Sequence, residues 1–182
     1  MPTYIDTFNQ FVSISVIFLQ AICLVLVVVM LFVPDRHNIV RKFFKDYAFY
    51  FGFLIALGAI ALSLFYSNVI GFPVCELCYL QRIFLYPQFI LFGMELYKKD
   101  RTIVDFSMVF ALLGIITSIY HIYIEHGGTS GLPCAVPSAT EVSCAVRYVF
   151  EFSYVTIPVM ALTASLFILL LMVNYKYVAK IK

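Results

Sequence analysis

Four of the five cysteines form two pairs whose spacing suits thiol–disulfide chemistry. Cys75 and Cys78 lie in the motif Cys-Glu-Leu-Cys, and Cys134 and Cys144 follow later in the chain. A two-residue gap gives a small disulfide ring, and such rings are usually redox-active rather than structural. An even set of cysteines in an oxidising compartment predicts two disulfides. Cys23 lies in a long apolar run, where we expect a small buried or lipid-facing residue.

Two structural interpretations of the same four cysteines stay open. Both pairs can simply staple loops together. The first pair also has the spacing of a zinc-binding motif, but the nine residues between Cys134 and Cys144 are unlike a second zinc-binding pair. A redox pair changes its oxidation state during its working cycle, whereas neither structural arrangement does.

Arg82 is placed where it could tune the reactivity of the first pair. It follows Cys78 by four residues, so the two share a helix face if a helix starts near Glu76. The start of that helix would favour a thiolate at Cys75 and Cys78 through its dipole, and a nearby guanidinium would favour it further. The structural alternative is an arginine that reaches toward lipid headgroups.

The composition predicts an integral membrane protein. Of the 182 residues, 63% are hydrophobic and 12% charged, and the mean hydropathy is +0.99. Soluble domains are roughly 45–50% apolar and about 25% charged, so a soluble globular domain and a disordered chain are both excluded. The net charge of +2 is too small to indicate nucleic-acid binding.

Five uncharged or nearly uncharged stretches are long enough to cross a bilayer as helices, which takes about 20 residues each. They are, approximately, Phe11–Val33, Tyr47–Cys75, Tyr79–Tyr97, Thr102–Ile124 and Phe152–Tyr175. The first is expected to be a retained helix rather than a signal peptide, because Met1–Gln10 has no lysine or arginine and the apolar run is too long.

The basic residues predict the orientation of these spans. Ten of the twelve lysines and arginines lie between spans one and two, between spans three and four, or after span five. Basic residues accumulate on the cytoplasmic side of a membrane. We therefore expect the N-terminus outside, the C-terminus in the cytoplasm, and all four paired cysteines on the extracytoplasmic side.

Three groups of residues resemble the DsbB family of disulfide bond formation proteins, in particular its short BdbC-type branch. The groups are Cys75-Glu-Leu-Cys-Tyr-Leu-Gln-Arg82-Ile with Tyr86-Pro87, then Gly131-Leu-Pro-Cys134 leading to Cys144 and to Val155-Thr-Ile-Pro158, and, more weakly, Tyr120-His121. Together they cover the chain from about Tyr47 to its C-terminus.

The resemblance implies an all-α membrane protein of the bacterial cytoplasmic membrane. Residues 47–182 would form a four-helix transmembrane bundle with an extracytoplasmic redox loop at 125–153. Residues 1–46 would add one N-terminal transmembrane helix and a basic cytoplasmic loop. That additional helix has no counterpart in the four-helix family core, and the segment Arg147–Tyr154, with Glu151, also departs from the usual apolar run.

The resemblance also implies a role for each site residue. Cys134 would form the mixed disulfide with a DsbA-like thioredoxin-fold oxidase outside the membrane, and Cys144 would exchange with Cys75. Cys78 would face a membrane quinone, ubiquinone or menaquinone, and Arg82 would stabilise its thiolate or the quinone oxygen. Independently of the family, a loop entered through glycines suits exchange with a protein partner, and a thiol pair at the lipid boundary suits a hydrophobic quinone.

A histidine near the end of the fourth span could supply a proton to a reduced quinone. The family comparison favours His121, while the pair Glu125-His126 is the other possibility. The structural alternative is an interfacial histidine whose ring is satisfied by water or backbone.

Two other functions remain as alternatives. An enzyme like vitamin K epoxide reductase also couples a CxxC to a quinone, but there the CxxC that faces the quinone follows the loop cysteines, whereas here it precedes them. The non-enzymatic alternative is a membrane binding protein held by disulfides or zinc, with cysteines that never change state. No metal is expected under the redox interpretation.

Overall fold

The computed structural model describes residues 3–32, 39–98, 102–128 and 143–179, and these residues are almost entirely helical. The only strand-like feature within those ranges is a single bridge between Glu151 and Val155. The elements are α1 (Thr3–Phe32), α2 (Ile39–Asp46), α3 (Ala48–Leu64), the π-helical turn η1 (Phe65–Val69), α4 (Glu76–Lys98), α5 (Ile103–Glu125) and α6 (Ile157–Ala179).

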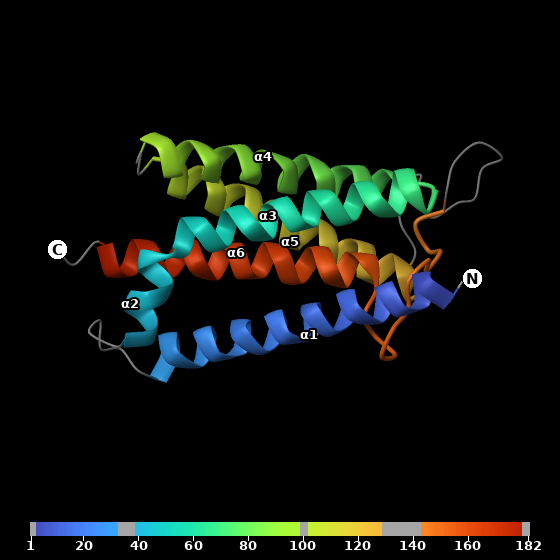
Figure 1. Cartoon of the computed structure of the whole chain (residues 1–182), viewed down its shortest axis with the longest axis horizontal. Helices are drawn as coiled ribbons and strands as arrows, with labels where there is room; N and C mark the ends of the chain where they lie inside the picture. The colour runs from blue at the N-terminus through green and yellow to red at the C-terminus, as the bar shows by residue number, and fades with distance from the viewer. Residues whose placement is uncertain (1–2, 33–38, 99–101, 129–142, 180–182) are drawn as a thin grey trace.

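Helices α3 to α6 form an antiparallel four-helix bundle (Figure 1). α3 packs against α4, α4 against α5, α5 against α6, and α6 returns to α3, so the four helices enclose a common core. α1 lies outside this ring along α6, and α2 crosses from α1 to α3 and contacts α6. The fold class expected from the sequence, a four-helix bundle with one additional N-terminal helix, is confirmed.

The two ends of the bundle differ in what they carry. Cys75, Cys78 and the start of α6 lie at one end, here called the redox end, together with the start of α1 (Figure 1). The other end, here called the α2 end, carries α2 and the end of α6. The first cysteine pair and the segment that leads into α6 therefore lie at the same end of the molecule.

Four helices in the described part of the chain are long and apolar enough to span a membrane: α1, α3 with η1, α5 and α6. α4 is as long as α5 and α6 and runs between α3 and α5, but Glu76, Arg82 and Glu95 make it more polar. Its polar side chains are accommodated by neighbouring helices rather than by lipid, as described below.

The helix bounds differ from the expected spans at several places. α1 begins at Thr3 rather than near Phe11, and the second span ends with η1 at Val69 rather than at Cys75. α6 begins at Ile157, not near Phe152, because Phe152 and Ser153 have φ of 50° and 66°, in the left-handed region that no α-helix uses. Pro158 then lies in the first turn of α6, where its missing N–H breaks no helical hydrogen bond. The basic segment expected to be a loop contains α2.

Close helix packing in the bundle depends on a glycine in α3. A Cβ atom at Gly52 would lie 2.8 Å from the ring of Phe92 on α4, and Phe92 is fully buried. By contrast, a Cβ at Gly58, also on α3, would meet no atom within 4 Å. The absence of a side chain is therefore a packing requirement at Gly52 but not at Gly58.

We expect Gly52→Ala to lower the stability of the protein and Gly58→Ala to leave it equal or higher. Overpacking against Phe92 costs about 1–3 kcal/mol, more than the roughly 0.5–1 kcal/mol that replacing a helical glycine gains. Thermal unfolding of the two variants in the same detergent or nanodisc compares them directly. Equal melting temperatures for the two variants would contradict the close contact.

Candidate functional site

The first cysteine pair lies at the turn that leads into α4. Gly71 adopts a φ of +84°, which favours glycine, and Cys75 immediately precedes the first residue of α4, Glu76. The backbone N–H of Cys78 donates to the sulfur of Cys75 at 3.4 Å. The sequence expectation that both thiols sit at a helix N-terminus is thus met by the position of α4, and free N–H groups there favour negative charge on sulfur.

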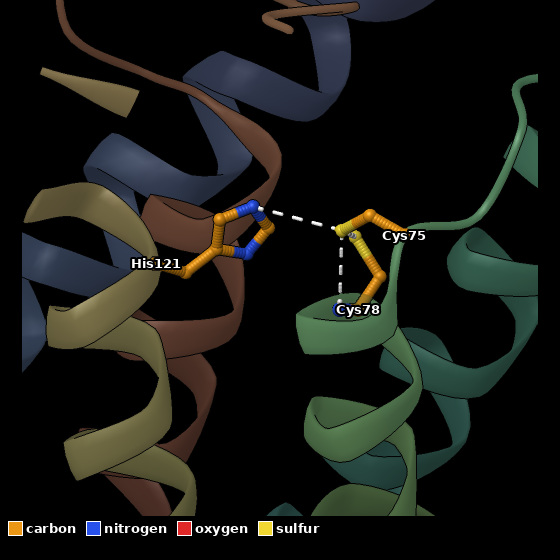
Figure 2. A group of neighbouring side chains, drawn as sticks. All are labelled: Cys75, Cys78 and His121. Carbon is orange, nitrogen blue, oxygen red and sulfur yellow. Dashed lines mark hydrogen bonds between the residues drawn. The ribbon is translucent and has the colours of Figure 1, made fainter. Parts of the chain in front are cut away.

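The thiols of Cys75 and Cys78 lie against each other and face a histidine of α5. Figure 2 shows the imidazole of His121 directed at the sulfur of Cys75 from the neighbouring helix. The two sulfurs are 2.8 Å apart, and Nε2 of His121 is 3.8 Å from the sulfur of Cys75. Cys75 and Cys78 are free thiols here, so of the two disulfides expected, the CxxC pair is present as a dithiol.

Cys144 completes this cluster from the segment that precedes α6. Its carbonyl oxygen is 3.2 Å from Nε2 of His121, the same nitrogen that faces Cys75. Cys75, Cys144 and His121 are all buried, with 5%, 1% and 3% exposure. Cys144 is disulfide-bonded, and the predicted residue Cys134 lies outside the described residues.

The segment that carries Cys144 is fixed to the end of α5 by polar contacts. The guanidinium of Arg147 donates to the backbone carbonyl of Glu125 at 2.7 Å, and the hydroxyl of Thr156 donates to the carboxylate of Glu125 at 2.9 Å. The ring of Tyr148 stacks on that of Phe72, with centroids 5.0 Å apart. Cys144 is therefore held beside the CxxC pair by contacts of the residues that follow it.

The surroundings of Cys75 stabilise its thiolate. The hydrogen bond from the Cys78 thiol is the largest effect, and the hydrogen bond and charge of His121 add to it. Burial opposes both, and together they lower the pKa of Cys75 to about 5. Reduced Cys75 is thus a thiolate at neutral pH, the form that reacts with disulfides and other electrophiles.

Arg82 is held by contacts with Ser63 on α3 and Tyr79 on its own helix. Its Nε donates to the hydroxyl of Ser63 at 2.8 Å, its Nη2 donates to the carbonyl of Ser63 at 3.0 Å, and its guanidinium lies over the ring of Tyr79. These contacts hold the guanidinium between α4 and α3 rather than at the lipid surface. Arg82 and Cys78, one helical turn apart, line the same cavity, described next.

Cys78 lies between two spaces of very different size. On one side is a hollow of about 20 Å³, hardly larger than one water molecule, which is also lined by Cys75, His121 and Cys144. On the other side is a cavity of about 750 Å³, within the range of ligand sites, which is also lined by Arg82. The large cavity has an almost wholly apolar lining apart from its end at the redox site.

The same thiols could also hold a metal ion. The ligand atoms of Cys75, Cys78 and His121 lie within 4.8 Å of one another, and sulfur and imidazole nitrogen are zinc ligands. Structural zinc sites have four ligands. Cys144 cannot supply a thiolate while its sulfur is in a disulfide.

The structure brings together most of the residues expected from the sequence. His121 is buried beside the thiols, whereas His126 is exposed and its Nδ1 lies 2.9 Å from a carbonyl of its own helix, so His121 is the histidine at the site. Sequence reasoning missed the structural role of Glu125, which is buried and receives Thr156. Its position four residues after His121 was the available signal, since both share one face of α5.

The region from residue 45 to residue 175 matches the family model described as "Disulfide bond formation protein DsbB". A "Probable disulfide formation protein" of Chlamydia pneumoniae is 34% identical over 137 residues, which are 75% of this chain and 97% of that relative. "Probable disulfide formation protein C 2" of Bacillus anthracis is 32% identical over 80% of this chain and 96% of that relative. "Disulfide bond formation protein C" of Bacillus subtilis is 34% identical over 68% of this chain and 88% of that relative. No solved structure gives a significant match to the chain.

We expect alkylation of reduced Cys75 to follow a midpoint near pH 5, because the thiolate is the reactive form and is lost below its pKa. Cys78→Ala should move this midpoint upward, and His121→Ala should move it upward by less, since the thiol contact is the larger effect. Iodoacetamide labelling between pH 4 and pH 9, with the labelled cysteine assigned by mass spectrometry, measures it. A midpoint that His121→Ala leaves unchanged would contradict the role of the imidazole.

Proposed function

Because the chain belongs to the DsbB family of disulfide bond formation proteins, we propose that it is a quinone-coupled thiol–disulfide oxidoreductase of the bacterial cytoplasmic membrane. It reoxidises an extracytoplasmic, DsbA-like thioredoxin-fold oxidase. The observation that carries this proposal is the position of Cys78 between the hollow that it shares with Cys144 and the large apolar cavity. A thiol pair so placed can receive electrons from one side and release them on the other.

On the protein side, the reaction is a pair of thiol–disulfide exchanges. The reduced partner attacks a disulfide between Cys134 and Cys144, leaves oxidised, and deposits its two electrons and two protons on those cysteines. Cys144 then attacks the sulfur of Cys75 in the oxidised Cys75–Cys78 pair, and Cys134 resolves the resulting mixed disulfide. The disulfide of Cys144 is restored and the CxxC pair becomes a dithiol, which is the combination of redox states described above.

The surroundings of the thiols support the direction of this exchange. The exchange ends with a thiolate on Cys75, so it is favoured when that thiolate is stable. The Cys78 thiol and His121 both stabilise the thiolate of Cys75. Reoxidation of the pair then requires the loss of two electrons but only the proton on Cys78, because Cys75 is already ionised at neutral pH. His121, which contacts Cys75 and the carbonyl of Cys144, keeps the two cysteines beside each other.

On the membrane side, the residues present fit a quinone. The cavity beside Cys78 is large and apolar, as a hydrophobic ring requires, and the guanidinium of Arg82 lines it one turn from the thiol. Arg82 would hold a quinone oxygen while Ser63 fixes the guanidinium. When bound, a quinone supplies the acceptor for two electrons and two protons. The hollow shared with Cys144 is too small for a quinone ring.

The proposed orientation places the redox end outside the cytoplasm. Basic residues gather at the α2 end, where α2 carries Arg41, Lys42 and Lys45 and the last turn of α6 carries Lys176. Basic segments favour the cytoplasmic side. An extracytoplasmic partner can then reach the loop that contains Cys134, while a quinone remains within the bilayer.

A metal-stapled membrane protein is the second candidate, favoured by the proximity of Cys75, Cys78 and His121. A bound zinc ion would use the same two sulfurs that must form a disulfide in the redox cycle. The two functions therefore exclude each other at this site and differ in whether the thiols change state.

Thiol trapping in native membranes tests the proposed function. We expect Cys75 and Cys78 to be disulfide-bonded in aerated membranes and to become accessible to a mass-tagged alkylating reagent when quinone is depleted, because they then lose their electron acceptor. Gel shifts with and without prior reduction count the modified cysteines. Thiols that stay oxidised without quinone would indicate structural staples, and thiols that label only after chelation would indicate a metal site.

A pair of serine variants provides the matched control. Cys78→Ser should abolish quinone reduction, while Cys23→Ser, which changes a buried cysteine of α1 far from the redox pair along the chain, should retain it. Full activity of the Cys78→Ser protein would rule out the proposed route.

A further inference from the structure

One wall of the large cavity beside Cys78 is formed by the helix that lies outside the family match. The match begins at residue 45, after α1 and most of α2. Yet the middle of α1 lines the cavity, from Phe11 to Ile22, with Ser15 and Leu19 among the residues that face it. The opposite wall is formed by α3, α4 and α6. Without α1, this space would be an open groove on the four-helix bundle.

α1 is fastened to the bundle by polar contacts that are unusual for so apolar a helix. At the redox end, the hydroxyl of Tyr66 donates to the side-chain oxygen of Asn9 at 2.9 Å, and both residues are buried. In mid-helix, the amide of Gln20 donates to Thr163 on α6 at 3.0 Å and accepts from Tyr154 at 2.8 Å. In an apolar environment such bonds determine which face of a helix is turned inward. The cavity-facing residues of α1 are therefore held in place.

The cavity extends from the redox site toward the α2 end. Its polar end is formed by Cys78, Arg82 and Ser63, and its far end reaches Phe43 and Phe44 on α2. Gly58 lies in the wall between these ends and leaves open space where a side chain would stand. A long apolar channel with one polar, thiol-bearing end fits a molecule with a polar ring and a long hydrocarbon tail.

We propose that α1 supplies the wall that makes the cavity a binding site for the isoprenoid tail of the quinone, whose ring is held at Cys78 and Arg82. This inference rests on the proposed function and adds tail recognition by α1. A membrane lipid is the competing occupant. The cavity is continuous with the thiol of Cys78, and this favours the quinone. A quinone ring can react with that thiol, whereas a lipid has no group that does so.

Two tryptophan reporters test whether a long-tailed quinone occupies the cavity beside α1, because the chain contains no tryptophan of its own. Leu19 lines the cavity, whereas Leu24, also on α1, is 67% exposed and does not line it. In lipid nanodiscs, a long-tailed quinone should quench Leu19→Trp fluorescence saturably and Leu24→Trp fluorescence only in proportion to its concentration in the lipid. Identical quenching curves for the two reporters would overturn the proposal.

A cavity-filling variant tests whether the space is needed. Gly58→Phe, made in the Leu19→Trp background, should weaken saturable binding of the long-tailed quinone at least about tenfold, since each methylene excluded from an apolar site costs about fourfold in affinity. Leu57→Phe, at a neighbouring position that does not line the cavity, should leave binding unchanged. Gel filtration and Cys75 alkylation report whether each variant is folded.

The outcomes separate this inference from the proposed function. If Gly58→Phe weakens the long-tailed quinone while a quinone with one isoprene unit is still reduced, both stand. If long-tailed binding is unchanged and only co-purified lipid is lost, the cavity is a lipid site and the inference fails while the function stands. If neither quinone is reduced by the unmodified protein, the proposed function itself fails, and any quenching of Leu19→Trp then reports binding alone.

Discussion

A polar side chain inside a bilayer must find its partner within the protein, and this constraint organises the whole bundle. α4 is the most affected helix, because it carries more polar groups than its neighbours. Its Gln81 donates to Ser118 on α5, and its Gln88 exchanges hydrogen bonds with Ser107, which is also on α5. Its Arg82 donates to Ser63 on α3. The helix that bears the reactive thiol is thereby bonded on two sides, and Cys78 is positioned by contacts one turn away from it.

This rigidity allows one pair of sulfurs to serve two environments. Cys75 lies in the polar cluster with His121 and Cys144, while Cys78 borders the apolar cavity as well. The two sulfurs are 2.8 Å apart, so the thiol pair belongs both to the cluster and to the edge of the cavity. In the proposed function, exchange with the protein partner and reduction of the quinone therefore take place on different sides of the same thiol pair.

Much of this could be predicted from the sequence, and the remainder depended on contacts between distant segments. Charge gaps predicted the spans, and α5 begins and ends within one residue of expectation. The last helix was placed too early, because an apolar run does not reveal the left-handed backbone of Phe152 and Ser153. The cysteine motif predicted a thiol pair at the start of a helix, but the cavity could not be predicted, since its walls come from helices far apart in the chain. The burial of Glu125 likewise depends on the later segment that carries Thr156.

The packing of α1 on α6 has a consequence for how the protein is made. α1 is synthesised before the bundle helices α3 to α6, and its main partner, α6, is the last of these four to be made. Until α6 has been made, α1 lacks this partner, and α1 is the most apolar of the four candidate membrane spans in the described chain. The wall that α1 contributes to the cavity can therefore be packed in place only after α6 has entered the membrane.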